Sequence, residues 1–328
     1  MTKASPQPSD RYSTRVLYIG GWGRSGSTLL SRMLGGMEGF FVAGELREIW
    51  SRCLGNQLCG CGTPFRSCEF WRGVGDEAFG GWDRAHLPEL VRLRRTLDRQ
   101  WSVPLLMLPL GSIPRWKPVR DYVTALQRLY AAIQTVSGAE VIVDSSKLPS
   151  YALMLRLMPS VDLRVLHLVR DSRGVLFSWQ KQVARLDTPH GEGMMLRYGL
   201  VAAAVRYDLY NLLTHRLRQM GYPYLLMRYE DLIADPRLSL RQAASHAGVD
   251  MPGAEFSFLQ NGSVSLGPNH MVDGNPLRFR VGTVPLQLDE TWRRGFSTNR
   301  RVAASVLTLP LLMKYGYVAG RGGRVRRS

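Results

Sequence analysis

A glycine-rich stretch near the N-terminus has the residue types and spacing of an anion-binding loop. It reads Gly21-Trp22-Gly23-Arg24-Ser25-Gly26-Ser27-Thr28. Glycines let the backbone curl so that successive N–H groups converge on one point, and a helix beginning at Ser27 would add its free N–H groups and its dipole. We therefore predict a phosphate or sulfate site built from Gly23, Arg24, Ser25, Gly26, Ser27 and Thr28. A tight strand-to-helix turn that uses glycine for geometry alone is the alternative.

The loop departs from the nucleotide-binding pattern G-x-x-x-x-G-K-[ST] at one informative position. Gly21, Gly26 and Thr28 fit the pattern, but Ser27 stands where the pattern has lysine. In nucleotide hydrolases that lysine reaches the β- and γ-phosphates, and Mg²⁺ is held beside it. Here the basic residue is Arg24, inside the loop. The pattern of a magnesium-dependent enzyme is thus incomplete, and an atypical P-loop kinase or hydrolase stays as the alternative function.

A second anion site is predicted where the apolar run Leu163–Val169 ends at Arg170. Ligands of an open parallel sheet sit outside the carboxyl ends of its strands, so Arg170 should lie at the same edge as the glycine-rich loop. Ser178 follows eight residues later, in the helix expected there. A planar guanidinium and a hydroxyl can together hold one phosphate. A salt bridge from Arg170 to Asp171 or Glu230 is the alternative.

Taken together, the two segments resemble the sulfotransferase family that uses 3′-phosphoadenosine 5′-phosphosulfate. Residues 23–29 are similar to that family's loop for the 5′-phosphosulfate, and residues 170–179 to its site for the 3′-phosphate. Residues 44–46 resemble the acidic element that follows the first helix in carbohydrate- and tyrosine-directed members. Residues 59–71 and 274–279 resemble elements of bacterial members. The resemblance implies a P-loop-like fold, no metal requirement, and 3′-phosphoadenosine 5′-phosphosulfate as co-substrate.

The resemblance also implies roles for basic residues. Negative charge builds on the leaving phosphate during sulfuryl transfer, and Arg24 is suited to stabilise it together with the N–H groups of the loop. A family lysine at a comparable place contacts the leaving or transferred group, which assigns Lys147 to the same charge; a surface lysine is the alternative. Arg278 and Arg280 resemble a late basic loop that closes over the nucleotide, with a solvated loop as the alternative.

The acceptor hydroxyl needs a base near the reaction centre. Glu45 is the best candidate, because it follows the helix that begins at the glycine-rich loop, and Glu48 is the second choice. Histidine bases occur in other branches of the family, so His190 and His270 rank below the two glutamates. Adenine would need an aromatic or apolar slot, for which the candidates are two residues that core packing would also explain, Trp22 and Trp179.

A parallel sheet is needed to hold these residues, and the sequence predicts one. Short runs that are apolar on both faces alternate with helical patterns, which is typical of α/β folds. The fold class is therefore α/β, a P-loop-like three-layer sandwich with a mostly parallel central sheet and helical insertions. The predicted strands are Val16–Ile19, Val141–Val143, Leu163–Val169 and Tyr224–Met227. The predicted helices are Ser27–Met37, one containing Tyr151 to Leu157, Arg173–Leu186, Met194–Met220, one from Asp231 onward, and most of Leu87–Gln134.

A single domain is the simplest division of the 328 residues. We predict a disordered leader at residues 1–14, one domain at 15–318 with a helical insertion at about 85–135, and a basic disordered tail at 319–328. There is no uncharged apolar run of about 20 residues, the length that a spanning helix requires. The leader lacks the apolar centre of a secretion signal. The expected location is the cytoplasm, with peripheral membrane contact left open.

Four cysteines lie close together in the sequence, within or just before Gly55–Gly81, a region that is expected to be irregular. Their spacing lacks the paired C-x₂-C units typical of structural zinc. In a reducing cytoplasm, free thiols that pack a small loop are the default expectation. Zinc or a disulfide is the alternative for this group, which comprises Cys53, Cys59, Cys61 and Cys68.

The net charge of +17 fits nucleic acid, an anionic membrane or a polyanionic small molecule as partner. The basic residues are spread along the chain without a basic face interleaved with aromatics, so nucleic-acid binding is not expected. The partner predicted instead is a small hydroxylated acceptor, such as a sugar, a lipid-linked sugar or an aromatic secondary metabolite. A receptor that binds a sulfated ligand without catalysis is a further alternative.

Overall fold

The computed structural model describes residues 14–107, 116–187, 193–251 and 256–318. The predicted tail and all of the predicted leader except Thr14 lie outside these ranges. Thr14 itself begins the first strand. Within the described residues, no helix is long and apolar enough to span a bilayer.

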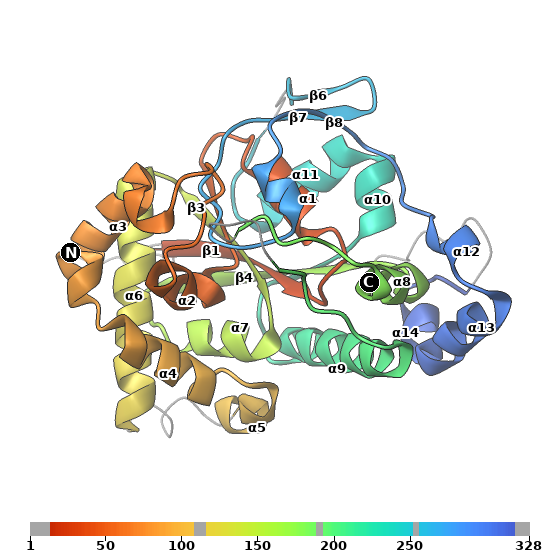
Figure 1. Ribbon diagram of the computed structural model, residues 1–328, viewed down its shortest axis with the longest axis horizontal. Coiled ribbons are helices and arrows are strands. Elements are labelled where there is room, and N and C mark those ends of the chain that lie inside the picture. Colours follow the sequence, from red (N-terminus) through yellow and green to blue (C-terminus); the bar gives the residue numbers. More distant parts are fainter. Residues whose placement is uncertain (1–13, 108–115, 188–192, 252–255, 319–328) are drawn as a thin grey trace, which may run out of the picture.

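A five-stranded sheet forms the centre of the molecule (Figure 1), and every neighbouring pair of its strands is parallel. The strand order is β2-β3-β1-β4-β5. This confirms the predicted α/β class with a parallel sheet. One strand, β2, had no counterpart among the sequence predictions, because it is short and directly follows a glycine. The strand bounds are β1 Thr14–Gly21, β2 Phe40–Gly44, β3 Val141–Lys147, β4 Val161–Val169 and β5 Tyr224–Arg228.

Helices cover both faces of the sheet, which explains why its strands are apolar throughout. On β1, Leu17 and Ile19 belong to one hydrophobic core and Val16 and Tyr18 to the other. The first core includes residues of α1 (Ser27–Leu34) and α11 (Pro236–His246), and the second includes residues of α6 (Lys117–Ser137) and α7 (Pro149–Arg156). Figure 1 shows α1 and α11 above the sheet and α7 below it. The predicted three-layer sandwich is therefore present.

Three of the predicted helices are shorter than the sequence pattern indicated. Helix α1 ends at Leu34 because Gly35 and Gly36 follow, and α8 (Ser172–Gln180) ends well before Leu186. Helix α9 (Leu200–Gln219) begins only after Gly199 rather than at Met194. Beyond α1, Met37 is buried in a non-helical conformation. Leu186 after α8, and Met194 and Leu196 before α9, are largely exposed, so the apolar spacing there does not mark a packed helix.

The helical insertion begins earlier in the chain than predicted. The region expected to be irregular contains α3 (Glu69–Phe79), whose Trp71, Val74 and Ala78 are buried. The remaining helices of this part are α2 (Ile49–Leu54), α4 (Leu87–Leu97) and α5 (Val103–Leu106), with 3₁₀ turns at Leu46–Glu48, Phe65–Ser67, Trp82–Arg84 and Gln100–Ser102. Residues 108–115, within the stretch Leu87–Gln134 predicted to be mostly helical, lie outside the described residues.

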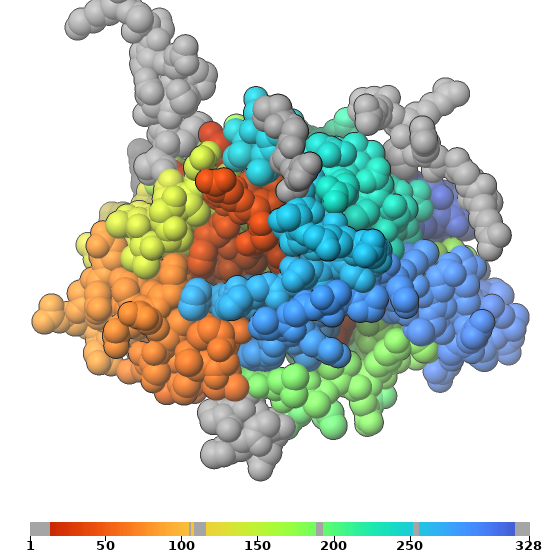
Figure 2. All heavy atoms as spheres, turned by 90° about the horizontal axis from the view of Figure 1, so that it is seen from above, coloured from red at the N-terminus to blue at the C-terminus, as the bar shows by residue number. Residues whose placement is uncertain are grey.

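A small antiparallel sheet and a C-terminal group of helices complete the fold, and sequence patterns predicted neither. The sheet contains β6 (Leu259–Gln260), β7 (Ser263–Leu266) and β8 (Gly282–Pro285). Figure 2 shows the light-blue chain that follows β7 running across the surface to meet the orange chain. At this contact the N–H of Gly60 donates to the carbonyl oxygen of Met271 at 3.0 Å. The C-terminal helices are α12 (Trp292–Gly295), α13 (Thr298–Leu307) and α14 (Leu309–Lys314), and a 3₁₀ turn spans Pro276–Phe279. Helices α10 (Tyr229–Ala234) and α11, by contrast, lie where a helix was predicted from Asp231 onward.

Helix α6 packs between the rest of the insertion and the sheet, so its buried residues should contribute to the free energy of unfolding. Leu129 is fully buried, whereas its neighbour Arg128 is exposed. Leu129→Ala is expected to lower the free energy of unfolding by about 2–5 kcal/mol, through lost burial and the cavity left behind. Arg128→Ala should change it by less than about 0.5 kcal/mol. Denaturant titration of both variants checks this, and equal effects would contradict the packing described here.

Candidate active site

The glycine-rich loop connects β1 to α1 and has the conformation of an anion-binding turn. Gly26 has a φ of 95°, and a Cβ atom there would lie 2.5 Å from the ring of Tyr229, so only glycine fits. Arg24 also has a positive φ, of 71°, which is unusual for a residue with a side chain. The N–H groups of the first turn of a helix have no partners within the helix. They are therefore free to bind an anion at the start of α1.

A cavity of about 800 Å³ opens over this loop. Its wall contains most of the predicted site residues, from the loop, from the ends of β2, β3 and β4, and from the segment after β7. Ser25 and Arg280 are not part of the wall. The Ser25 hydroxyl is buried without a hydrogen-bond partner among the described residues, and Arg280 is exposed. The predicted residues in the wall are Gly23, Arg24, Gly26, Ser27, Thr28, Glu45, Lys147, Arg170, Ser178 and Arg278.

Arg170 faces the glycine-rich loop, as the second anion site requires. It is 7% exposed, and its Nη1 donates to the carbonyl oxygen of Arg24 at 3.3 Å. Its Nη2 lies 3.1 Å from the carboxylate of Asp289, and its guanidinium lies 4.6 Å from the ring centre of Tyr229. The alternative salt bridge to Asp171 or Glu230 is absent between these described residues, because Asp171 pairs with Arg173 instead. The loop and Arg170 thus form one continuous basic wall.

Asp289 is the ion-pair partner that sequence reasoning missed. Burial raises the pKa of its carboxyl group, but hydrogen bonds from Thr291 and Arg170 outweigh burial and lower the pKa to about 2. The carboxylate is therefore ionised at neutral pH and neutralises part of the charge on Arg170. No signal in the sequence marks it, because Asp289 lies 119 residues from Arg170.

Glu45 and Lys147 form an ion pair inside the cavity. Glu45 directly follows β2, and Lys147 is the last residue of β3, so neighbouring parallel strands bring the two side chains together. The side chains are only 22% and 14% exposed. Burial raises the pKa of Glu45, and the charge of Lys147 opposes this rise. The pair therefore joins a carboxyl group of raised pKa, suited to accept a proton, to a cation that partly offsets the rise.

The buried carboxyl group of Asp144 supports the turn that carries Lys147. The Asp144 carboxylate accepts two hydrogen bonds from Ser146, from its N–H at 2.8 Å and from its hydroxyl at 2.5 Å. It accepts a third from the hydroxyl of Tyr130. Ser146 in turn accepts a hydrogen bond from the N–H of Arg47, 3.0 Å away. Burial raises the pKa of Asp144 to about 6. Asp144 is fully buried and does not line the cavity, so its hydrogen bonds hold the turn before Lys147 in place.

The other predicted base residues are less suitably placed. Glu48 lines the cavity, but its carboxylate is held by Arg47 at 2.5 Å and by Arg94 at 2.8 Å. His270 does not line the cavity, and its ring nitrogen Nδ1 lies close to the sulfur atoms of Cys59 and Cys68. His190 lies outside the described residues.

Arg278 lines the cavity but is mostly engaged elsewhere. It is 1% exposed, and its guanidinium donates to the carbonyl oxygens of Val272 and Leu58. Its Nη2 lies 3.7 Å from Asp187, which Arg52 also binds, at 2.6 Å. This arrangement anchors the loop before β8 and leaves Arg278 poorly placed to bind a phosphate. Four charged residues that line this part of the cavity were not predicted from the sequence: Arg52, Arg185, Asp187 and Asp273.

Aromatic and apolar side chains also line the cavity, and Trp179 lies next to the glycine-rich loop. Trp22 and Trp179 stack with ring centres 5.0 Å apart, and the indole nitrogen of Trp179 donates to the carbonyl oxygen of Gly23 at 3.1 Å. Trp22 is nearly buried, so it packs in the core. Three side chains at the cavity edge are largely exposed, as a surface for an apolar ligand would be: Leu186, Met194 and Leu196.

The fold and the cavity define an α/β enzyme whose glycine-rich loop and strand-end arginine face one anion-binding space. A model of the sulfotransferase family matches residues 69–253. The chain therefore belongs to the sulfotransferase family and is a sulfotransferase.

Two solved structures are among the most similar. The sulfotransferase domain of the olefin synthase from Synechococcus PCC 7002 is 21% identical, with a TM-score of 0.53, over 96% of this chain and 99% of that one. The sulfotransferase domain of the curacin biosynthetic pathway is 18% identical, with a TM-score of 0.47, over 90% of this chain and 97% of that one. At such low identity, the first of these shows that the fold is shared. Among curated proteins, none matches the sequence significantly.

The Glu45–Lys147 pair leads to a prediction about titration. Lys147→Met is expected to raise the pKa of Glu45 further, because the variant removes the charge that most opposes the effect of burial. A carbon-13 NMR titration of the glutamate carboxyl groups measures this. Lys181→Met is the matched control, since Lys181 contacts Thr291 outside the cavity wall and should leave Glu45 unchanged. A pKa of Glu45 that stays constant or falls in Lys147→Met would refute the coupling.

Proposed function

We propose that this sulfotransferase moves a sulfuryl group from 3′-phosphoadenosine 5′-phosphosulfate to a hydroxyl group of a small acceptor. The proposal rests on the observation that the glycine-rich loop and Arg170 line the same cavity. A donor with anionic groups at both ends of an adenosine needs two basic sites on one wall, and the cavity has them. Its volume of about 800 Å³ is in the range that binds small molecules.

The donor would be held by hydrogen bonds to both of its charged ends. The N–H groups at the start of α1 and the Arg24 guanidinium are suited to the 5′-phosphosulfate. Arg170 and Ser178 are suited to the 3′-phosphate. Burial lowers the pKa of Arg24, but an arginine remains charged at neutral pH. Its partly dry surroundings strengthen its attraction to an anion.

Glu45 would act as the base and Lys147 would stabilise charge. The carboxylate takes the proton of the acceptor hydroxyl while the acceptor oxygen forms a bond to sulfur. The bond between sulfur and the bridging oxygen breaks in line, and 3′-phosphoadenosine 5′-phosphate leaves. Lys147 and Arg24 then face the negative charge that develops on the bridging oxygen. The ion pair seen between Glu45 and Lys147 holds both groups near the loop before substrates bind.

The acceptor is expected to carry an apolar or aromatic part beside its hydroxyl group. The exposed side chains at the cavity edge, Leu186, Met194 and Leu196, would contact it. A glycolipid and an aromatic secondary metabolite fit this edge better than a free sugar, although the aromatic wall can also stack on a sugar ring. Incubation with labelled donor and a panel of such hydroxylated compounds, read as a mass gain of one sulfate, identifies the acceptor.

The role of Glu45 can be tested by a conservative substitution. Glu45→Gln is expected to lower turnover by about 100-fold or more, as for loss of a general base. Affinity for 3′-phosphoadenosine 5′-phosphate should be unchanged, because the amide keeps the size of the side chain. Glu38→Gln, at an exposed position, is the control and should be fully active. Turnover of Glu45→Gln at the wild-type rate would remove Glu45 from the role of base.

The donor site can be tested separately by isothermal titration calorimetry. The wild type is expected to bind 3′-phosphoadenosine 5′-phosphate without Mg²⁺, and Arg170→Met to bind it about 10- to 100-fold more weakly, as for loss of charged hydrogen bonds. Arg128→Met removes an exposed arginine and should not change the affinity. A preference for ATP with Mg²⁺ would favour the kinase or hydrolase alternative and overturn the proposed donor.

A further inference from the structure

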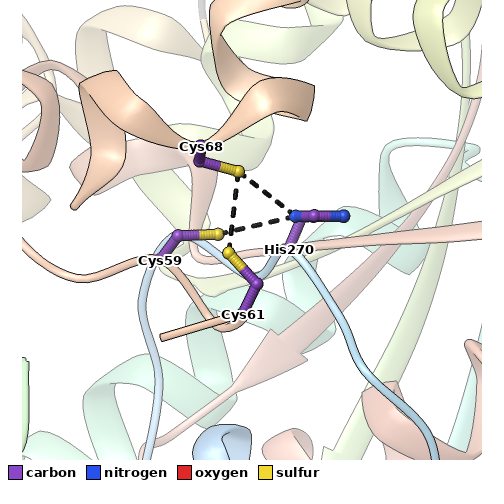
Figure 3. A group of neighbouring side chains, drawn as sticks. All are labelled: Cys59, Cys61, Cys68 and His270. Carbon is purple, nitrogen blue, oxygen red and sulfur yellow. Dashed lines mark hydrogen bonds between the residues drawn. The ribbon is translucent and has the colours of Figure 1, made fainter. Parts of the chain in front are cut away.

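A second group of chemistry-bearing side chains lies outside the cavity wall (Figure 3). It consists of Cys59, Cys61, Cys68 and His270. One ligand atom from each residue lies within 4.8 Å of the ligand atoms of the other three. Three of the four cysteines of the chain are thus gathered around one histidine. In Figure 3 the three thiols and the imidazole point toward a common centre.

Three of the distances between ligand atoms are close to the edges of a tetrahedral zinc site, and all of them are within 4.8 Å. Zinc bonds sulfur at about 2.3 Å and imidazole nitrogen at about 2.0–2.1 Å, so tetrahedral geometry places two sulfurs about 3.8 Å apart and sulfur and nitrogen about 3.6 Å apart. In the structure, the sulfurs of Cys61 and Cys68 are 3.7 Å apart. Nδ1 of His270 lies 3.3 Å from the sulfur of Cys68 and 3.8 Å from that of Cys59.

The surrounding residues hold the four ligands in this position. The N–H of Gly62 donates to the carbonyl oxygen of Cys59 at 2.8 Å, which makes a tight turn around Cys61. A Cβ atom on Gly60 would lie 2.2 Å from Oδ1 of Asn269, so glycine is needed where the two segments meet. Phe70 stacks on the His270 ring with centres 5.1 Å apart. Fixed orientation of a ligand histidine is a regular feature of metal sites.

Neither a disulfide nor simple packing of thiols explains this arrangement as well. A disulfide joins two sulfurs at about 2.05 Å and gives no reason for a third cysteine and a histidine to converge there. Packing of thiols likewise does not require an imidazole nitrogen directed at the sulfurs. His270 is 202 residues from Cys68, so the fold brings the fourth ligand from a different part of the chain. This distance explains why the cysteine spacing alone did not predict a zinc site.

We propose that Cys59, Cys61, Cys68 and His270 bind one structural zinc ion. Soft thiolates with one imidazole in a tetrahedral set favour zinc among the common divalent metals. All four positions are filled by protein, which distinguishes a structural site from a catalytic one. None of the four residues lines the cavity, so the ion takes no part in sulfuryl transfer.

The ion would cross-link the helical insertion to a segment of the active site. Met271 directly follows the histidine ligand, and its carbonyl oxygen accepts the N–H of Gly60 at 3.0 Å. The N–H of Val272 donates to the carbonyl oxygen of Ala43 at 2.9 Å, two residues before Glu45. Asp273 then lines the cavity. The zinc site would therefore fix one wall of the cavity without contacting a substrate.

The metal content of the full chain tests the proposal directly. Protein purified without chelator from zinc-supplemented medium is expected to contain about one zinc ion per chain by mass spectrometry of the elements. Removal of the ion by a zinc-selective chelator should lower the melting temperature, and zinc but not Mg²⁺ should restore it. Protein without zinc, or with iron in its place, would overturn the proposal. A count of two free thiols in the denatured, unreduced protein would instead reveal a disulfide and would equally overturn it.

Two cysteine variants distinguish a zinc ligand from a cysteine that binds no metal. Cys61 is exposed, so Cys61→Ser should disturb packing least, and it is expected to lose the zinc. Cys53 is buried but is not among the four ligands, and Cys53→Ser should retain the metal of the wild type. A folded Cys61→Ser protein with full zinc content would refute the site. If that variant does not fold, the chelator titration of the wild type decides the question. The donor-binding test uses a separate variant, because Arg170 is not one of these four residues.

Discussion

The parallel pairing of β1 with a strand on each side is the constraint on which the rest of the structure depends. The register sets Lys147 of β3 beside Gly20 and Leu168 of β4 beside Gly21. Parallel strands end at the same edge, so Lys147, the glycine-rich loop and Arg170 all reach one side of the sheet. No long-range folding of loops is needed to assemble these cations. The two cores on either side of β1 hold this register, because a slip of one residue would exchange the faces of every strand side chain.

Bringing these cations together carries an electrostatic cost that the fold offsets with carboxylates. Arg170 faces Asp289, Lys147 faces Glu45, and Arg52 binds Asp187 and Asp273. Unpaired buried charges would be strongly destabilising. The partners therefore keep the cavity stable in the absence of an anion.

Residues close together in the chain, or placed by strand ends, could be predicted from the sequence. The glycine-rich loop, Arg170, Glu45 and Lys147 depend on local pattern and on the rule for parallel sheets, and the structure brings them to one cavity. The antiparallel sheet could not be predicted, because its strands are at most four residues long. Partners such as Asp289 and His270 could not be assigned either, since their contacts depend on segments more than 100 residues apart.

The contact between Gly26 and Tyr229 has a consequence for how the protein is made. The loop is synthesised early, but the ring that packs against it follows the last strand of the parallel sheet, about 200 residues later. A nascent chain that lacks this strand has the glycines but not the surface that shapes them. Because domains generally fold as units during synthesis, the anion-binding conformation should arise only when translation has passed the fifth strand.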